Sequence, residues 1–94
     1  MSSDLNHAPR PVVAACFLLD AEAAPGLLPR LLQPFAKRDL TPDRLSAQRV
    51  AGGLRVEIAV VDVDGATLSL IEGNLRQVVG VRQISRGASL LQAA

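Results

Sequence analysis

Few residues of this 94-residue chain are of types that carry chemistry. The chain has one cysteine, Cys16, and one histidine, His7. A nucleophilic cysteine needs a base beside it, and His7 stands in a polar segment ahead of the apolar run VVAACFLL that contains Cys16. A soft-metal site needs paired thiolates, and an internal disulfide needs two cysteines. We therefore expect Cys16 to be a buried, inert thiol.

Two pairs of carboxylates are the next candidates for catalysis or cation binding. Asp20 and Glu22 flank a predicted loop, and Asp62 and Asp64 precede a predicted helix. Either pair could bind a cation or act as acid and base, but neither has a third ligand at a suitable spacing. Helix capping and solvation are the interpretation we favour. The sequence thus predicts no catalytic residue, no metal site and no cofactor, and a protein that is not an enzyme.

The turn at Pro25 and Gly26 is the remaining candidate site. Gly26 has no side chain, so another backbone or a small ligand can approach it closely. The helix that begins here has unpaired N–H groups and the positive end of its dipole, which together could hold a carboxylate. From the residues alone, a plain strand-to-helix connection is the favoured interpretation, and a carboxylate site is the alternative.

Charge and composition exclude several classes of partner. The net charge is +1, and the two phenylalanines are the only aromatic residues. Neither nucleic acid nor anionic lipid is therefore an expected partner, since base stacking needs exposed aromatics and phosphate binding needs a basic surface. No apolar run is long enough to cross a membrane, and the N-terminal segment lacks the pattern of a signal peptide. We expect a cytoplasmic protein.

Hydrophobic periodicity predicts the elements of the first half of the chain. Residues 12–19 read as a buried strand, and residues 20–26 as a loop. A helical stripe follows, ending at the basic pair Lys37 and Arg38 and made of Leu27, Leu28, Leu31, Leu32 and Phe35. Pro34 is expected to kink or loosen the last turns of this helix, and Asp39 to take the turn position that usually favours glycine.

In the second half of the chain, the pattern of hydrophobic residues predicts a hairpin, a helix and a strand. Residues 44–50 and 54–63 read as strands joined by the turn AGG. The second of these strands alternates, with Leu54, Val56, Ile58 and Val60 expected inward and Arg55, Glu57 and Ala59 outward. Asp64 is a plausible N-cap for a helix that ends at Gly80, with the stripe Leu68, Ile71, Leu75, Val78 and Val79. A short strand at 81–85 ends the domain.

This order of elements predicts an α+β, ferredoxin-like βαββαβ fold, with two helices on one face of a four-stranded antiparallel sheet. The handedness of crossovers places the first and third strands in the centre of that sheet. The expected organisation is a tail at 1–11, one domain at 12–86 and a C-terminal tail at 87–94.

A family resemblance becomes visible at this point. The stretch APGLLPRLLQPFAKRDL, followed by a hairpin and LSLIEGNLRQVVGVRQI, resembles an ACT domain, and the resemblance covers roughly residues 12–86. ACT domains are ferredoxin-like regulatory modules that bind small molecules, commonly amino acids. The length and layout are most similar to the short single-ACT regulatory subunits of acetolactate synthase, which activate a thiamine-dependent catalytic partner.

The resemblance implies a site between two copies that pair side by side. The N–H groups of Gly26 and Leu27 would hold the carboxylate of an effector. The implied contacts are Ala24, Pro25, Gly26 and Leu27 of one copy, closed by Leu45, Ser46, Ala47 and Gln48 of its neighbour. Many amino-acid-binding members have Asp or Asn three residues before the glycine. This chain has Ala23 there, and its nearest acids are Glu22 and Asp20.

We therefore expect a non-catalytic regulatory protein that binds a small metabolite, an amino acid above all, and modulates a partner enzyme. It would work as a homodimer or a higher homo-oligomer. The alternative is a structural small subunit of an acetolactate-synthase-like enzyme that binds no effector and docks a large catalytic subunit. Small aliphatic residues on the sheet, such as Ala14, Ala59 and Val61, indicate that another subunit covers some of its surface.

Overall fold

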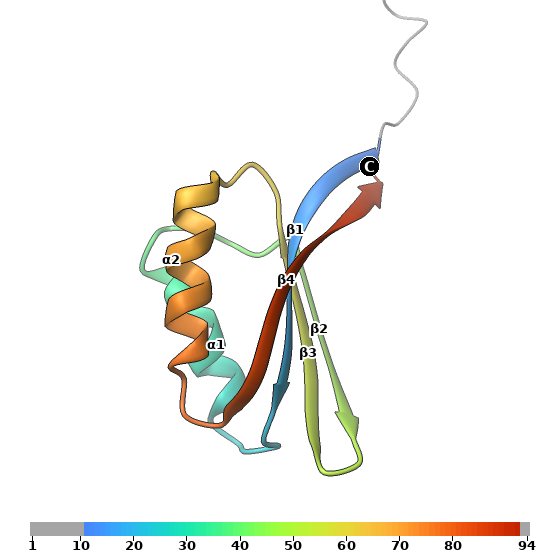
Figure 1. Ribbon diagram of the computed structural model, residues 1–94, viewed down its shortest axis with the longest axis vertical. Helices are drawn as coiled ribbons and strands as arrows, with labels where there is room; N and C mark the ends of the chain where they lie inside the picture. The colour runs from blue at the N-terminus through green and yellow to red at the C-terminus, as the bar shows by residue number, and fades with distance from the viewer. Residues whose placement is uncertain (1–10, 93–94) are drawn as a thin grey trace, which may run out of the picture.

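The computed structural model describes residues 11–92, which form one sheet and two helices (Figure 1). The elements in chain order are β1 (Pro11–Ala21), α1 (Leu27–Ala36), β2 (Arg44–Val50), β3 (Gly53–Val60), α2 (Gly65–Arg76) and β4 (Val81–Gln92). The strands lie in the order β2-β3-β1-β4, and all neighbours are antiparallel. Both helices cover one face of the sheet, so the predicted ferredoxin-like fold is confirmed, including its central pair of strands. The predicted N-terminal tail falls almost wholly outside the described residues.

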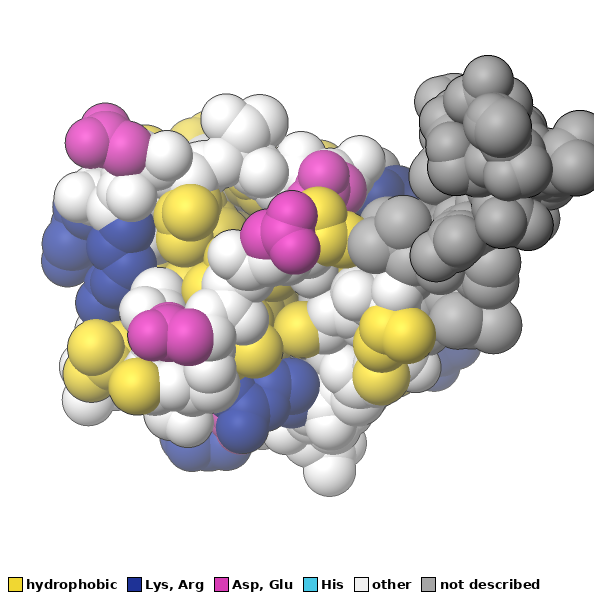
Figure 2. Space-filling model, turned by 90° about the horizontal axis from the view of Figure 1, so that it is seen from above, with side chains coloured by type: hydrophobic (Ala, Val, Ile, Leu, Met, Phe, Trp, Pro, Cys, Tyr) yellow, Lys and Arg dark blue, Asp and Glu magenta, His cyan; other side chains and the backbone are white. Residues whose placement is uncertain are grey.

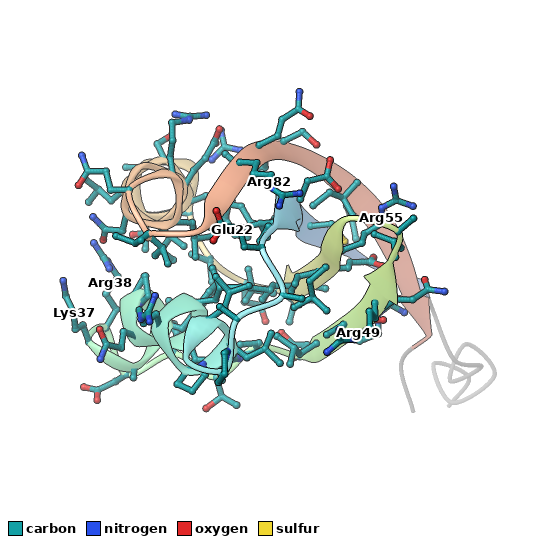
Figure 3. All side chains as sticks on the ribbon, turned by 90° about the horizontal axis from the view of Figure 1, so that it is seen from below. Glu22, Lys37, Arg38, Arg49, Arg55 and Arg82 are labelled. Atoms are coloured by element: carbon teal, nitrogen blue, oxygen red, sulfur yellow. The ribbon has the colours of Figure 1, made fainter. Side chains whose placement is uncertain are left out.

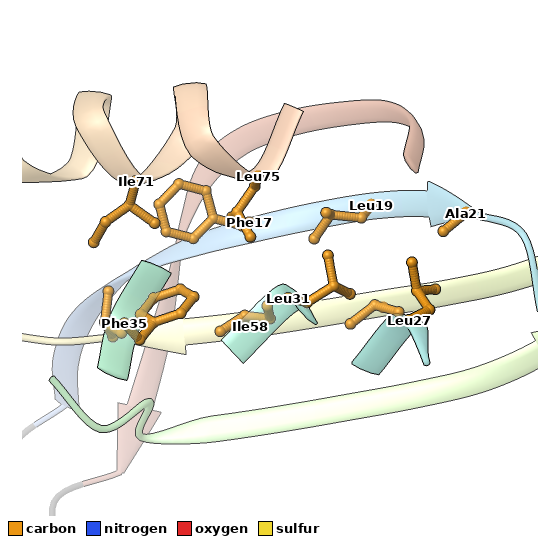
Figure 4. Packing of buried hydrophobic residues seen from close by; sticks show 11 residues of the cluster. Phe17, Leu19, Ala21, Leu27, Leu31, Phe35, Ile58, Ile71 and Leu75 are labelled. Atoms are coloured by element: carbon orange, nitrogen blue, oxygen red, sulfur yellow. The ribbon is translucent and has the colours of Figure 1, made fainter. Parts of the chain in front are cut away.

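The main core lies between the sheet and the two helices (Figure 4). Strands β1 and β3 each turn alternate side chains toward the helices, as the period of two along a strand requires. Phe17 of β1 and Phe35 of α1 meet edge to face, with ring centroids 6.1 Å apart. The fully buried side chains of this core are Phe17, Leu19, Ala21, Leu27, Leu31, Phe35, Val56, Ile58, Val60, Ile71 and Leu75.

Helix α1 ends directly before the predicted basic pair of Lys37 and Arg38, and it is not interrupted at Pro34. Pro34 lies inside the last turn and is buried, and the helix continues past it to Ala36. The Arg38 guanidinium donates from Nη1 to the carbonyl oxygen of Pro34 at 2.8 Å, and from Nη2 to Oδ1 of Asn74 at 3.0 Å. Asp39 adopts a φ of 56°, the left-handed turn conformation expected of it. Arg38 thus caps the end of α1 and ties it to α2.

The last strand is longer than predicted. A short strand at 81–85 and a tail from 87 were expected, but β4 continues to Gln92 and pairs with β1 along its whole length. The segment GASLLQ has weak strand propensity by itself, and the cross-strand pairing with β1 overrides it. The second helix is shorter than predicted, since α2 ends at Arg76 and Val79, assigned to its stripe, is 79% exposed.

The sheet face away from the helices carries a second, small apolar cluster. Ala14, Cys16 and Ala59 are buried there, with Val61 packed against them. Ala59 does point away from the helices as predicted, yet it is fully buried. The Cys16 thiol, 4% exposed, donates to Oε2 of Glu57 at 3.6 Å. The expectation of a buried thiol is therefore confirmed.

The N-cap of α2 is the one predicted from sequence. Asp64 has extended backbone angles, and its Oδ1 accepts a hydrogen bond from the Thr67 N–H at 3.0 Å. Hydrogen bonds from the side chain and then the backbone of Thr67 lower the pKa of the Asp64 carboxyl from its ordinary value of 3.8. The carboxylate is therefore the form that stabilises the folded state.

We expect Asp64→Ala to lower the melting temperature at neutral pH, because the Thr67 N–H loses its partner. Since the folded pKa is depressed, this contribution is present above the unfolded pKa and is lost as pH falls through the folded pKa. The gap in melting temperature between wild type and Asp64→Ala should therefore close in acid. Circular dichroism melts over a pH series measure it, with the non-titrating cap Asp64→Asn as the control. A gap of constant size at every pH would contradict the assignment.

Candidate functional site

The loop between β1 and α1 is held by backbone hydrogen bonds, some within the loop and one to Gly80. The Glu22 N–H donates to the carbonyl oxygen of Gly80 at 2.8 Å, and the Ala24 N–H donates to that of Glu22 at 2.9 Å. The Leu27 N–H donates to the carbonyl oxygen of Ala24 at 3.1 Å. Leu27 is also fully buried, so its N–H, expected to hold a carboxylate, is occupied within the loop. Among the described residues, the Gly26 N–H donates no hydrogen bond and stays available.

Arg30 brings a positive charge to the turn. A Cβ atom built on Gly26 would lie 2.8 Å from Nη2 of Arg30, so the guanidinium lies directly against this glycine. Its Nη1 donates to the carbonyl oxygen of Val79 at 3.3 Å. Sequence reasoning missed Arg30, although its spacing of one helical turn from Gly26 was a usable signal. The turn thus combines a helix N-terminus with a cation, and an added side chain at Gly26 would displace the cation.

The second set of predicted contacts lies on the edge strand β2. Leu45 and Ala47 are paired with Ile58 and Val56, so they share the helix-covered face of the sheet. Ser46 and Gln48 alternate with them and belong to the opposite face. All four side chains are exposed. Within the described part of one chain, therefore, β2 does not close over the loop, and its outer edge pairs with no other strand.

Two further charged side chains stand free at this end of the molecule (Figure 3). Arg49, on the same face of β2 as Ala47, has no hydrogen bond or ion pair within the described residues. Glu22 likewise has an exposed, unpaired carboxylate in the described part of the chain. Asp20, in contrast, is paired with Arg55 at 3.7 Å. Of the two acids near Ala23, Glu22 is thus the one whose carboxylate is available.

Comparisons with known proteins show the family of the chain. A family model described as an ACT-like domain matches residues 10–92. The chain belongs to the ACT-like domain family. The match includes the last strand in full, in agreement with a β4 that runs to Gln92.

Solved structures place this ACT-like domain in the same fold. The ACT domain of the GTP pyrophosphokinase of Chlorobium tepidum superposes with a TM-score of 0.67 at 17% identity, covering 83% of this chain and 100% of that one. An uncharacterized protein of Thermotoga maritima superposes with a TM-score of 0.61 at 14% identity, covering 84% of this chain and 98% of that one. At such identities the likeness establishes the fold.

The family match establishes a broad function. ACT-like domains are typically regulatory and ligand-binding, and they are generally non-catalytic. No curated protein matches the chain, so the resemblance to the regulatory subunits of acetolactate synthase stays a prediction. In the described part of the chain, no helix is long and apolar enough to cross a membrane. Residues 11–92 also contain no group of three or more His, Cys, Asp or Glu residues placed to hold a metal ion.

Proposed function

We propose that this ACT-like domain is a non-catalytic regulatory module that binds a small carboxylate-bearing metabolite, an amino acid above all, between two copies of the chain. The single observation that carries the proposal is the Pro25–Gly26 turn, where the free Gly26 N–H and the Arg30 guanidinium lie together at the start of α1. A helix N-terminus and a guanidinium both favour an anion, and a guanidinium can bind a carboxylate through two hydrogen bonds.

The charges around the turn suit an amino acid. The carboxylate of the ligand would contact the Gly26 N–H and Arg30, while the unpaired carboxylate of Glu22 would bind the ammonium group in place of the residue missing at Ala23. Arg49, free on β2, offers a second cation for a ligand with an acidic side chain. The contact assignment thus changes from the two N–H groups of Gly26 and Leu27 to Gly26 together with Arg30.

The second copy would close the site through β2. An edge strand presents unpaired N–H and C=O groups, and a two-fold antiparallel pairing of two β2 strands would satisfy them. Pairing centred on Ala47 sets Arg44 opposite Val50 and Leu45 opposite Arg49, so no like charges face each other directly. This arrangement would bring Leu45, Ser46, Ala47 and Gln48 of the neighbour toward the loop.

Regulation would follow from linkage. A ligand that contacts both copies binds the paired state better than the separate chains, and therefore shifts the population toward it. A partner enzyme that binds the paired state would then respond to the concentration of the ligand. Thermal shift and calorimetry against the twenty amino acids test the proposal. A ligand at a hundred times its dissociation constant should stabilise the fold by about 2.7 kcal/mol.

We expect Gly26→Asp to lower the affinity for such a ligand about tenfold to a hundredfold, the equivalent of a charge-assisted hydrogen bond. The new carboxylate would sit at the N-terminus of α1 beside Arg30 and occupy the place of the ligand's own. The fold should tolerate it, since Gly26 has a φ of −92° and only the flexible Arg30 side chain stands in the way. Isothermal titration calorimetry is the measurement.

Gly65→Asp is the matched control for this variant. It adds the same charge at the start of α2, where no atom lies within 4 Å of a built Cβ, and affinity should be unchanged. Equal losses of ligand affinity in both variants would mean a non-specific charge effect. Unchanged affinity in Gly26→Asp would mean that the ligand does not bind at this turn. If no amino acid binds wild type, the occupied Leu27 N–H and Ala23 favour the structural-subunit alternative. Co-purification with a thiamine-dependent large subunit then decides it.

A further inference from the structure

Strands β1 and β4 extend together beyond the rest of the sheet (Figure 1). Their pairing runs from Ala21 to Pro11, which stands opposite Gln92. The pairing of β1 with β3 stops where Ala15 faces Val60. Residues 11–14 and 89–92 therefore form a two-stranded extension, called the arm below. Over residues 11–14, the edge of β1 that pairs with β3 in the rest of the sheet has no partner strand among residues 11–92.

The end of β3 is fixed by specific contacts, so this open edge is part of the fold. The Asp43 N–H donates to the carbonyl oxygen of Ala59 at 2.8 Å, and Oδ2 of Asp43 accepts from the Val61 N–H at 2.9 Å. Asp62 then takes a φ of 57°, and this left-handed residue turns the chain toward α2. A bare strand edge is a template for another strand.

A partly apolar hollow lies beside this edge. It measures about 550 Å³. Its lining combines the apolar residues Val13, Ala15, Val60, Val63 and Leu68 with the charged residues Asp62 and Arg86. Val13 is 65% exposed. Figure 2 looks onto this end and shows hydrophobic side chains at the surface among acidic and basic ones. Since a two-stranded ribbon is marginal in water by itself, an arm with an exposed apolar side chain and an adjacent hollow calls for a covering partner.

The arm lacks charged residues, which are the main protection of natural strand edges. Pro11–Leu19 and Gly87–Ala94 contain none, so only Pro11 and the short length of the edge oppose its pairing with another strand. The surfaces of α1, α2 and β2 all carry arginine or lysine. The arm of a second copy therefore offers an uncharged strand edge of the same length. Two such identical edges can pair about a two-fold axis without bringing like charges opposite each other.

We propose that the arm is a self-association site, at which the free edge of β1 pairs antiparallel with the same edge of a second copy and covers the hollow beside Val13. This interface is separate from the proposed pairing of β2 strands, because it uses β1 and β4 beyond the end of β3. It does not depend on any ligand. Used together, the two interfaces would join dimers into a higher homo-oligomer.

Sedimentation equilibrium in an Ala47→Lys background tests the arm alone, because that substitution sets two lysines opposite each other in the proposed β2 pairing. This protein should still dimerise, and adding Val13→Lys should weaken its dimerisation at least tenfold. Adding Val79→Lys, which makes the same substitution at an even more exposed valine away from the arm, should leave dimerisation unchanged. A monomeric Ala47→Lys protein, or equal effects of both added lysines, would overturn the proposal.

Cross-linking gives a second measurement that needs no disruption of the interface. Val13→Cys in a Cys16→Ala background should give a covalent dimer with a short bismaleimide, whose reach covers a register slip of one residue. Val79→Cys in the same background should stay monomeric in the denaturing gel. A monofunctional maleimide shows whether the new cysteine is accessible. If it reacts with that reagent but gives no cross-linked dimer, the proposal is overturned.

Discussion

Phe17→Ala is expected to destabilise the fold by about 3–5 kcal/mol, the typical cost of removing a buried phenylalanine ring. Phe17 is fully buried at the centre of β1, where the ring of Phe35 from α1 meets it edge to face. Against a total of about 5–15 kcal/mol for a domain, such a loss leaves little stability. Urea unfolding at a fixed protein concentration measures it, because self-association would otherwise change the midpoint.

Leu70→Ala is the control, since Leu70 is 60% exposed on α2 and its removal should change stability by about 0.5 kcal/mol or less. A double-mutant cycle with Phe35→Ala should give a coupling of about 0.5–1.5 kcal/mol between the two rings. A loss at Phe17 no larger than that at Leu70 would contradict the packing of α1 on β1.

Gly53→Asn is the second large expected effect, with a loss of about 1–3 kcal/mol or more from overpacking. A Cβ atom at Gly53 would lie 2.5 Å from the carbonyl oxygen of Ala21, the last residue of β1, and this neighbour is backbone. The end of a central strand must therefore move, whereas Nη1 of Arg82, 2.9 Å away, can swing aside. Chemical unfolding followed by far-ultraviolet circular dichroism is the measurement.

The adjacent glycine provides a control for this substitution. Gly52 has a φ of +82° and no atom within 4 Å of a built Cβ. Asparagine tolerates the left-handed conformation, so Gly52→Asn should cost little. Two variants of equal stability would mean that the contact between Gly53 and Ala21 relaxes without strain.

Local patterns predicted the fold because the residues concerned need no distant partner. The alternation of Val56 and Ile58 fixes which face of β3 is buried, and the cap at Asp64 uses an N–H three residues away. The length of β4 could not be predicted in this way. Its pairing energy comes from β1, more than sixty residues earlier in the sequence, so the segment after Arg86 carries no signal of its own.

In the candidate site, too, nearby residues predicted some features, while others depend on residues far away in the sequence. The turn at Gly26 follows from a proline, a glycine and a leucine-rich stripe. That Arg30 lies against Gly26 depends on a side-chain conformation supported by Val79, far away in sequence. That Leu27 donates to Ala24 depends on the detailed path of the loop. Periodicity contains neither fact, so the position of the turn was predictable while its hydrogen-bond donors were not.

The hydrogen bond from Glu22 to Gly80 gives the loop a mechanical connection. Gly80, with a φ of 103°, is the pivot at which the chain passes from α2 into β4. The loop that carries the Pro25–Gly26 turn and the start of the edge strand β4 are therefore joined by a direct backbone hydrogen bond, although the two segments are more than fifty residues apart in the sequence.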